Sequence, residues 1–309
     1  MDPSIAAIPA VRQRRLRKRR TARRGASVNL LYLPALALFA VFTVYPLISG
    51  LLLAFTNWDG YSPERSWVGL TNFARLFSDQ TFRSVLGNTF VYGIGSTVLQ
   101  QVLGLALALA LNRRIRGRGV ARGVIYLPVL VSPVVMGTFY YLVFQYNNGS
   151  LNDVVTAFGG ERQAWFSSPG AGIAIITAVN TIQFVGTSMI VYLAGLQSIA
   201  PEYLEAATLD GAGAVQRFRY VVAPLLQPAF LTSVILNLIG GLKLFDVIQV
   251  LTGGGPGTST ASVSTLIGTT YFGNQAAGYA AAMGIALFVI IAVLTVFANS
   301  ALNRRRIDQ

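Results

Sequence analysis

The chain has 309 residues, of which 53% are hydrophobic and 11% are charged. A soluble domain usually carries about a quarter charged residues, so this composition favours a single membrane domain. Cys and His are both absent, which excludes disulfides, thiolate nucleophiles, Cys/His metal sites and histidine acid–base chemistry. We expect no metal site, no cofactor and no catalytic residue.

Six intervals without a charged residue each have room for the roughly 20 mostly apolar residues that cross a bilayer as a helix. In chain order, the predicted spans are 29–54, 88–111, 123–145, 171–196, 223–245 and 279–302. An even number of spans places both termini on one side. The pattern predicts an all-α polytopic membrane protein with six transmembrane helices.

Lys and Arg gather on one side of these spans. Nineteen lie in the two tails, the loop 112–122 and the segment 197–222, whereas four lie in the loops opposite. Because loops rich in Lys and Arg stay in the cytoplasm, both termini are predicted to be cytoplasmic, in a plasma or inner membrane. The run from Arg12 to Arg24 is interpreted as an anchor at anionic headgroups, rather than a nucleic-acid arm or a cleaved signal peptide.

The segment from Pro201 to Pro224 predicts two short helices outside the membrane. Pro201 suits the first turn of a helix, and carboxylates at Glu202 and Glu205 would complement the helix dipole. Gly211 can adopt the left-handed conformation that ends a short helix. From periodicity alone, an ordinary amphipathic loop stays possible.

The residues of this segment resemble the EAA loop of permease subunits in binding-protein-dependent ABC importers. In that family the loop forms a coupling helix that docks on the ATPase subunit. The resemblance implies that Glu205 faces a cation or helix end on the ATPase and that Gly211 makes the turn. It also implies close packing at small residues. The positions carried over are Glu205, Ala206, Ala207, Asp210, Gly211, Ala212 and Phe218.

The resemblance covers most of the chain after the first ~25 residues and is closest to the F-type partner of maltose and glycerol-phosphate permeases. The maltose F-type has two extra spans and a large external loop that this chain lacks. Matching segments include Tyr45-Pro46-Leu47, Val68-Gly69-Leu70, Lys243-Leu244-Phe245-Asp246 and Gly253-Gly254-Gly255-Pro256. It implies a type I importer fold with a cytoplasmic tail (1–27), a first helix and external loop (28–83), a permease core (84–303) containing the coupling loop (197–222) and a second tail (304–309).

The function implied is one half of a pore that imports a sugar or sugar-like solute. The implied partners are a second related permease in a heterodimer, an ATPase dimer, an external solute-binding protein and the lipid bilayer, with no nucleic acid. Thr252–Gly257 lacks the Gly-Lys-Ser/Thr of a phosphate loop, so ATP hydrolysis is assigned to a separate subunit and the chain is not an enzyme. The alternatives are a permease of the same fold for glycerol-3-phosphate or another polar solute, a secondary transporter and a membrane-embedded enzyme.

Polar residues inside the predicted spans mark a candidate substrate path. They fall on one face of the fourth span and at i, i+4 in the fifth, where they either line a translocation cavity or hydrogen-bond neighbouring helices. The candidates are Asn180, Gln183, Thr187, Ser233 and Asn237. Lys243 and Asp246, at i, i+3, are expected to pair near the outer interface, with a gate element or ligand contact as the alternative.

Overall fold

The computed structural model describes residues 32–113 and 115–303, which form two compact units divided between Leu53 and Ala54. In the first unit, α2 (Leu33–Phe39), η1 (Ala40–Val44) and α3 (Tyr45–Leu53) make one continuous apolar helix. None of its side chains is buried within the chain. Both predicted tails beyond these limits, and Arg114 in the loop 112–122, lie outside the described residues.

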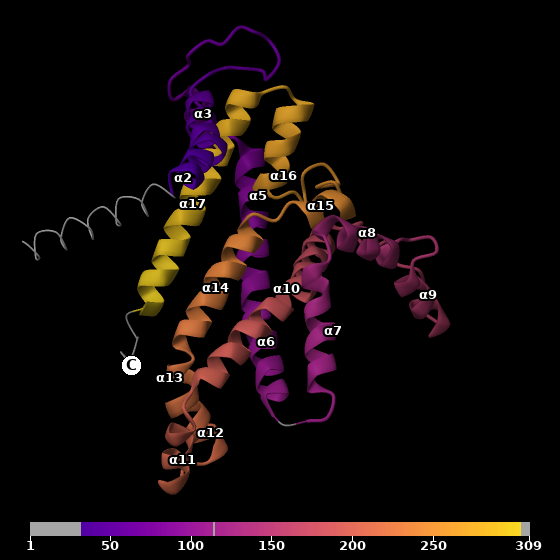
Figure 1. Cartoon of the computed structure of the whole chain (residues 1–309). Coiled ribbons are helices and arrows are strands. Elements are labelled where there is room, and N and C mark those ends of the chain that lie inside the picture. Colours follow the sequence, from indigo (N-terminus) through magenta and orange to yellow (C-terminus); the bar gives the residue numbers. More distant parts are fainter. Residues whose placement is uncertain (1–31, 114, 304–309) are drawn as a thin grey trace, which may run out of the picture. The chain divides into compact units, whose positions relative to one another are not determined.

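Helices are the only extended regular secondary structure in the described part of the second unit, which also has one isolated bridge between Thr56 and Trp67 (Figure 1). This confirms the predicted all-α class. Its elements in chain order are α4 (Thr71–Ser78), α5 (Gln80–Phe90), η2 (Val91–Gly95), α6 (Ser96–Asn112), α7 (Arg118–Leu130), α8 (Pro133–Phe144), α9 (Ser150–Ala157), α10 (Pro169–Ser198), α11 (Pro201–Leu209), α12 (Ala214–Arg217), η3 (Phe218–Val222), α13 (Ala223–Leu225), α14 (Gln227–Leu242), α15 (Asp246–Leu251), α16 (Val263–Gly268), η4 (Thr269–Gly273) and α17 (Ala277–Asn303).

Five helices in the described part of the chain are long and apolar enough to cross a membrane, and a bent pair makes a sixth candidate. Four of the five lie in the second unit: Gln80–Asn112, Pro169–Ser198, Gln227–Leu251 and Ala277–Asn303. They correspond to the predicted second, fourth, fifth and sixth spans. The second begins earlier than predicted because the Asp79 side chain accepts a hydrogen bond from the Phe82 N–H and starts the helix at Gln80.

The third span is not the straight helix predicted at 123–145. It consists of α7 and α8, which are bent by 100° relative to each other. Pro133 opens α8 and has no N–H to continue the hydrogen bonds of α7. Val131 and Ser132 before it have extended backbone, with ψ of 139° and 134°, as the residue before a proline generally does.

Helix α10 packs against α6, α7 and α14 through close approaches at glycine. A Cβ on Gly104 of α6 would lie 2.4 Å from Ser188 Cβ, and one on Gly186 would lie 2.8 Å from the Ile125 carbonyl oxygen of α7. Small residues at helix crossings are the usual means of tight packing in membranes, where apolar burial alone gives helices little reason to associate.

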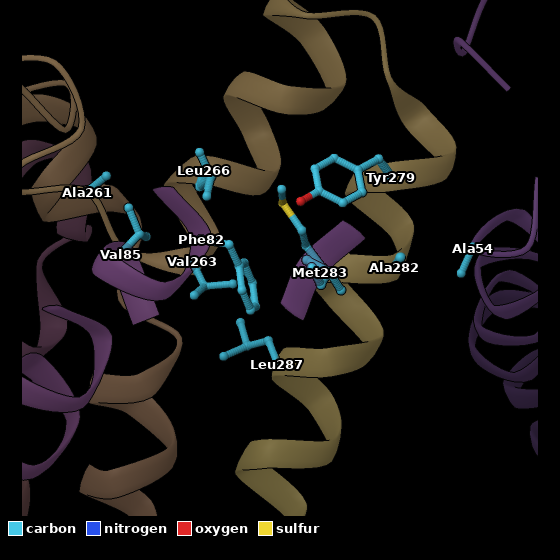
Figure 2. Packing of buried hydrophobic residues seen from close by; sticks show 11 residues of the cluster. Ala54, Phe82, Val85, Ala261, Val263, Leu266, Tyr279, Ala282, Met283 and Leu287 are labelled. Atoms are coloured by element: carbon cyan, nitrogen blue, oxygen red, sulfur yellow. The ribbon is translucent and has the colours of Figure 1, made fainter. Parts of the chain in front are cut away.

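A separate apolar cluster joins α5, α16 and α17. In Figure 2 the Phe82 ring lies beside Val263 and Leu287, and Met283 packs close by. The segment after Ala54 belongs to this part of the fold, since the Asn72 carboxamide donates to the carbonyl oxygen of Ala54 at 2.9 Å. The cluster anchors the end of the unit that lies opposite α11 and α12 (Figure 1).

Candidate coupling loop and transport cavity

The segment predicted as two short helices forms α11 and α12, at the end of the unit where α6 turns into α7 (Figure 1). Gly211 has φ +78°, the left-handed conformation predicted for the turn. The Gly211 N–H donates to the Thr208 carbonyl at 3.1 Å and the Ala212 N–H to the Ala207 carbonyl at 3.0 Å. These bonds satisfy the last carbonyls of α11 and close the helix.

A side-chain bond that the sequence pattern did not reveal ties the two short helices together. The Arg217 guanidinium donates from Nη1 to Thr208 Oγ1 at 2.9 Å. Thr208 Oγ1 in turn donates to the Leu204 carbonyl at 2.7 Å. Thr208 and Arg217 are nine positions apart across a turn. Neither helical nor strand periodicity predicts a contact at this spacing, so the bond could not be predicted without the geometry of the turn.

The loop is exposed where the resemblance places its contacts. Glu205, Ala206 and Asp210 are exposed, whereas Ala207 and Ala212 are partly covered. Two apolar side chains are also open to solvent, Leu209 at 89% and Val215 at 79%. These two side chains are free to contact a protein partner.

Phe218 lies on the other side of the loop and faces the bundle. It lines an apolar cavity of about 490 Å³ together with the residues Leu105, Tyr192, Ala223, Pro224, Leu226, Gln227, Phe230 and Leu302. Phe218 also opens the π-helix η3, in which the Ala223 N–H bonds back to the Phe218 carbonyl. The loop is therefore continuous with the transmembrane helix α14 through η3 and α13.

A second cavity, of about 240 Å³, lies among α6, α10, α14 and α15. Three of the predicted path residues line it, namely Asn180, Thr187 and Asn237. The other lining residues are Gln100, Pro133, Phe184, Leu236, Gly240, Gly241, Lys243, Leu244, Phe245, Asp246 and Val247. Gln100 was not predicted, although Ser96 and Thr97, at i−4 and i−3, mark the same face of α6 and could have identified it.

Hydrogen bonds hold the walls of this cavity together. Gln100 Nε2 donates to the Asn180 carbonyl at 3.0 Å, joining α6 to α10. Asn237 Nδ2 donates to Ser188 Oγ at 2.5 Å, joining α14 to α10. The two readings of the polar residues are thus not exclusive, since Asn237 both lines the cavity and bonds to another helix.

Comparison with known proteins places this chain. Residues 100–308 match the model of the family described as "Binding-protein-dependent transport system inner membrane component". The chain belongs to this family. Similar relatives include the trehalose/maltose transport system permease protein MalF of Thermococcus litoralis, 32% identical with 86% of this chain and 90% of the relative covered. Another is the multiple sugar-binding transport system permease protein MsmF of Streptococcus mutans, 35% identical with 84% and 90% covered.

The fold of this inner membrane component is that of solved ABC importers. A crystal structure of a bacterial ABC transporter that imports the acidic polysaccharide alginate matches with a TM-score of 0.81 and 26% identity, covering 93% of this chain and 99% of that chain. A second structure, of the alginate transporter with its alginate-bound periplasmic protein, matches with a TM-score of 0.79 and 25% identity over 93% and 96%. The predicted type I importer fold is confirmed.

Two predicted path residues of the permease lie away from its cavity. Gln183 is fully buried and Ser233 is 1% exposed. Both amide atoms of Gln183 and the hydroxyl of Ser233 have no hydrogen-bond partner in the described part of the chain. Their polarity was the reason for predicting them in the cavity wall. In the structure, the orientation of α10 and α14 places both side chains among the packed helices.

Lys243 and Asp246 do not form the predicted pair. No ion pair within 4.0 Å joins them, and the one salt bridge between described side chains links Arg162 to Asp153. The i, i+3 argument required a continuous helix, whereas α14 ends at Leu242 and Phe245 has non-helical dihedrals of −132° and −61°. Both charged residues instead line the cavity.

The glycine-rich segment after α15 forms a tight loop. Gly253, Gly254 and Gly257 all have positive φ, and the Thr260 N–H closes the loop onto the Gly254 carbonyl at 3.1 Å. Among the described residues, no group of three or more His, Cys, Asp or Glu side chains could hold a metal ion.

Proposed function

We propose that this chain is the F-type permease subunit of an ABC importer for a carbohydrate. The observation that carries the proposal is the α11–α12 loop, with its left-handed turn at Gly211 and its exposed apolar tip at Leu209 and Val215. The sugar-transport names of the relatives MalF and MsmF support the substrate class. The resemblance carried by Glu205, Ala206, Ala207, Asp210, Gly211, Ala212 and Phe218 supports the role of the loop.

The partners in this proposal are a second permease, an ATPase dimer and an external solute-binding protein. A periplasmic protein accompanies the alginate transporter in one matching structure, which supports the last of these. The ATPase docks on the α11–α12 loop, so that loop and both termini lie in the cytoplasm. ATP is hydrolysed by that separate subunit, because the two lysines of this chain are not part of a Gly-Lys-Ser/Thr motif.

The substrate path in this proposal runs past Asn180, Thr187 and Asn237. Their amide and hydroxyl groups suit the hydroxyls of a sugar, which neutral hydrogen-bonding groups recognise without a large desolvation cost. ATP-driven closure of the ATPase pair moves α11 and α12. The motion reaches α14, which carries Asn237, through Phe218, η3 and α13. Access to the cavity then changes from one side of the membrane to the other.

Uptake into proteoliposomes tests the proposal. The chain is co-expressed with its partner permease and ATPase, and the purified assembly is supplied with its binding protein and a radiolabelled neutral disaccharide. We expect uptake that requires enclosed ATP and the binding protein. Uptake driven by an ion gradient without ATP would instead identify a secondary transporter, and assembly without any ATPase would remove the role of the loop.

A further inference from the structure

The break between α14 and α15 is a defined structural feature of the cavity wall. α14 ends at Leu242 and α15 begins at Asp246. The Leu244 side chain is buried in an apolar cluster, and its carbonyl accepts a hydrogen bond from Ser262 Oγ at 2.6 Å. The Lys243 N–H still bonds to the Ile239 carbonyl at 3.1 Å. The residues on each side of the break therefore have fixed positions.

This break presents two opposite charges to the cavity. Lys243 is exposed and Asp246 partly exposed. They are the charged members of the cavity lining, and no described ion pair neutralises either of them. Charged residues inside a membrane protein are costly and are usually retained where they face a cavity and bind something. A structural pair would have offset that cost, but the geometry does not form one.

We propose that Lys243 and Asp246 bind the substrate and give the cavity a preference for neutral sugars over anionic ones. The inference rests on the proposed function and names its substrate class. The Asp246 carboxylate can accept hydrogen bonds from two hydroxyls, and the Lys243 ammonium can donate to hydroxyl or ring oxygens. The lining is neutral overall, with one charge of each sign among amides and hydroxyls. For a sugar carboxylate the repulsion of Asp246 and the attraction of Lys243 would nearly cancel, so the lining would not offset the cost of removing that charge from water.

The test compares uptake of two sugars by the reconstituted importer. The probes are a neutral disaccharide and its uronic acid counterpart, each supplied with the same binding protein, so selection by that protein is constant. We expect Asp246→Asn to raise the ratio of anionic to neutral uptake about tenfold and Lys243→Met to lower it by a similar factor. The conservative variants Asp246→Glu and Lys243→Arg keep both charges and should keep the wild-type ratio.

Opposite changes in the ratio cannot come from a general loss of structure, which would reduce uptake of both sugars alike. Equal loss of both sugars in Asp246→Asn and Lys243→Met would therefore overturn this inference and leave the proposed function in place. Uptake of neither sugar by the wild-type importer would overturn the proposed function and this inference with it. Lys243 is exposed, so its variants provide the comparison even if Asp246→Asn fails to assemble.

Discussion

At Gly211, backbone conformation alone determines which side chains the turn accepts. A Cβ built on this glycine would meet no atom within 4 Å, so space is not the constraint. The constraint is its φ of +78°. A β-branched side chain in this left-handed region is strained by about 1–3 kcal/mol. Asn tolerates this region better than other non-glycine residues.

Gly211→Val should abolish substrate-stimulated ATP hydrolysis by the reconstituted importer. The strain misdirects α12 and so the surface offered to the ATPase, whereas Gly211→Asn should keep most of the stimulation. Gly213 is the matched control, since its φ is −68° and its Cβ would lie 3.7 Å from Gln216 Oε1. Gly213→Ala should behave as wild type, and unchanged stimulation in Gly211→Val would remove the coupling role of the turn.

Asp79 shows how a charge outside the spans is held at the start of a helix. Partial burial raises the pKa of its carboxyl, but three other contributions outweigh this and lower the pKa overall. They are the Tyr279 hydroxyl, which donates at 2.7 Å, the backbone N–H groups of Phe82 and Thr81, and the charge of Arg75. Because the pKa of Asp79 is lower in the folded state, the ionised carboxylate stabilises the fold at pH values above its unfolded pKa of about 4. This stabilisation is lost as the pH falls through the lowered pKa of the folded state.

Tyr279→Phe should destabilise the permease at neutral pH and matter little in acid. Loss of the hydroxyl raises the pKa of Asp79 toward its usual value and removes about 1 kcal/mol at pH 7, a modest figure because solvent screens the carboxylate. Melting temperatures of both proteins in detergent from pH 7 to pH 3 should converge as pH falls. Tyr271→Phe, at a hydroxyl with no described hydrogen bond, is the control. A pH-independent difference would show that Asp79 is not involved.

At the scale of elements, the apolar composition and the helix-ending residues predicted which segments are helical. They did not predict how the helices are bent or interrupted. The apolar intervals gave five of the spans correctly, since bilayer thickness fixes the length of an apolar run. The bend at Val131 and Ser132 lies inside such a run, whereas the break after Leu242 lies where the charged residues Lys243 and Asp246 interrupt the apolar sequence. Pro133 and the Lys243–Asp246 pair marked these positions in the sequence, but a helix can pass such residues with only a small bend, so the 100° angle between α7 and α8 could not be predicted from them.

The α11–α12 element can be tested through its side-chain bond. Thr208→Val keeps the shape of the side chain but removes the acceptor for Arg217, a bond of about 0.5–1.5 kcal/mol. We expect the two helices to loosen and substrate-stimulated ATP hydrolysis to fall severalfold without loss of assembly. Thr208→Ser retains the hydroxyl and should stay near wild type. If Thr208→Val and Thr208→Ser stimulate equally, the bond does not set the loop geometry.

For the whole molecule, the distribution of charge predicts the orientation in the membrane, which the fold alone does not test. The α11–α12 loop and the α6–α7 turn lie at one end of the second unit (Figure 1), and Lys and Arg are concentrated in these segments and the tails. The segment with Arg162, between α9 and α10, lies at the other end of α10 from α11. Retention of cationic loops in the cytoplasm then sets the direction of every span.

Single cysteines test this orientation, because the chain has none of its own. Gly213→Cys should be tolerated, since its backbone is extended and its Cβ makes only an ordinary contact. Glu161, at the other end of α10 from the α11–α12 loop, is exposed and is a better site than Gly159, whose φ of +82° disfavours a side chain. With a membrane-impermeant maleimide, Glu161→Cys should label in intact cells and Gly213→Cys only after permeabilisation. Labelling of Gly213→Cys in intact cells would place the α11–α12 loop outside, where no ATPase could reach it.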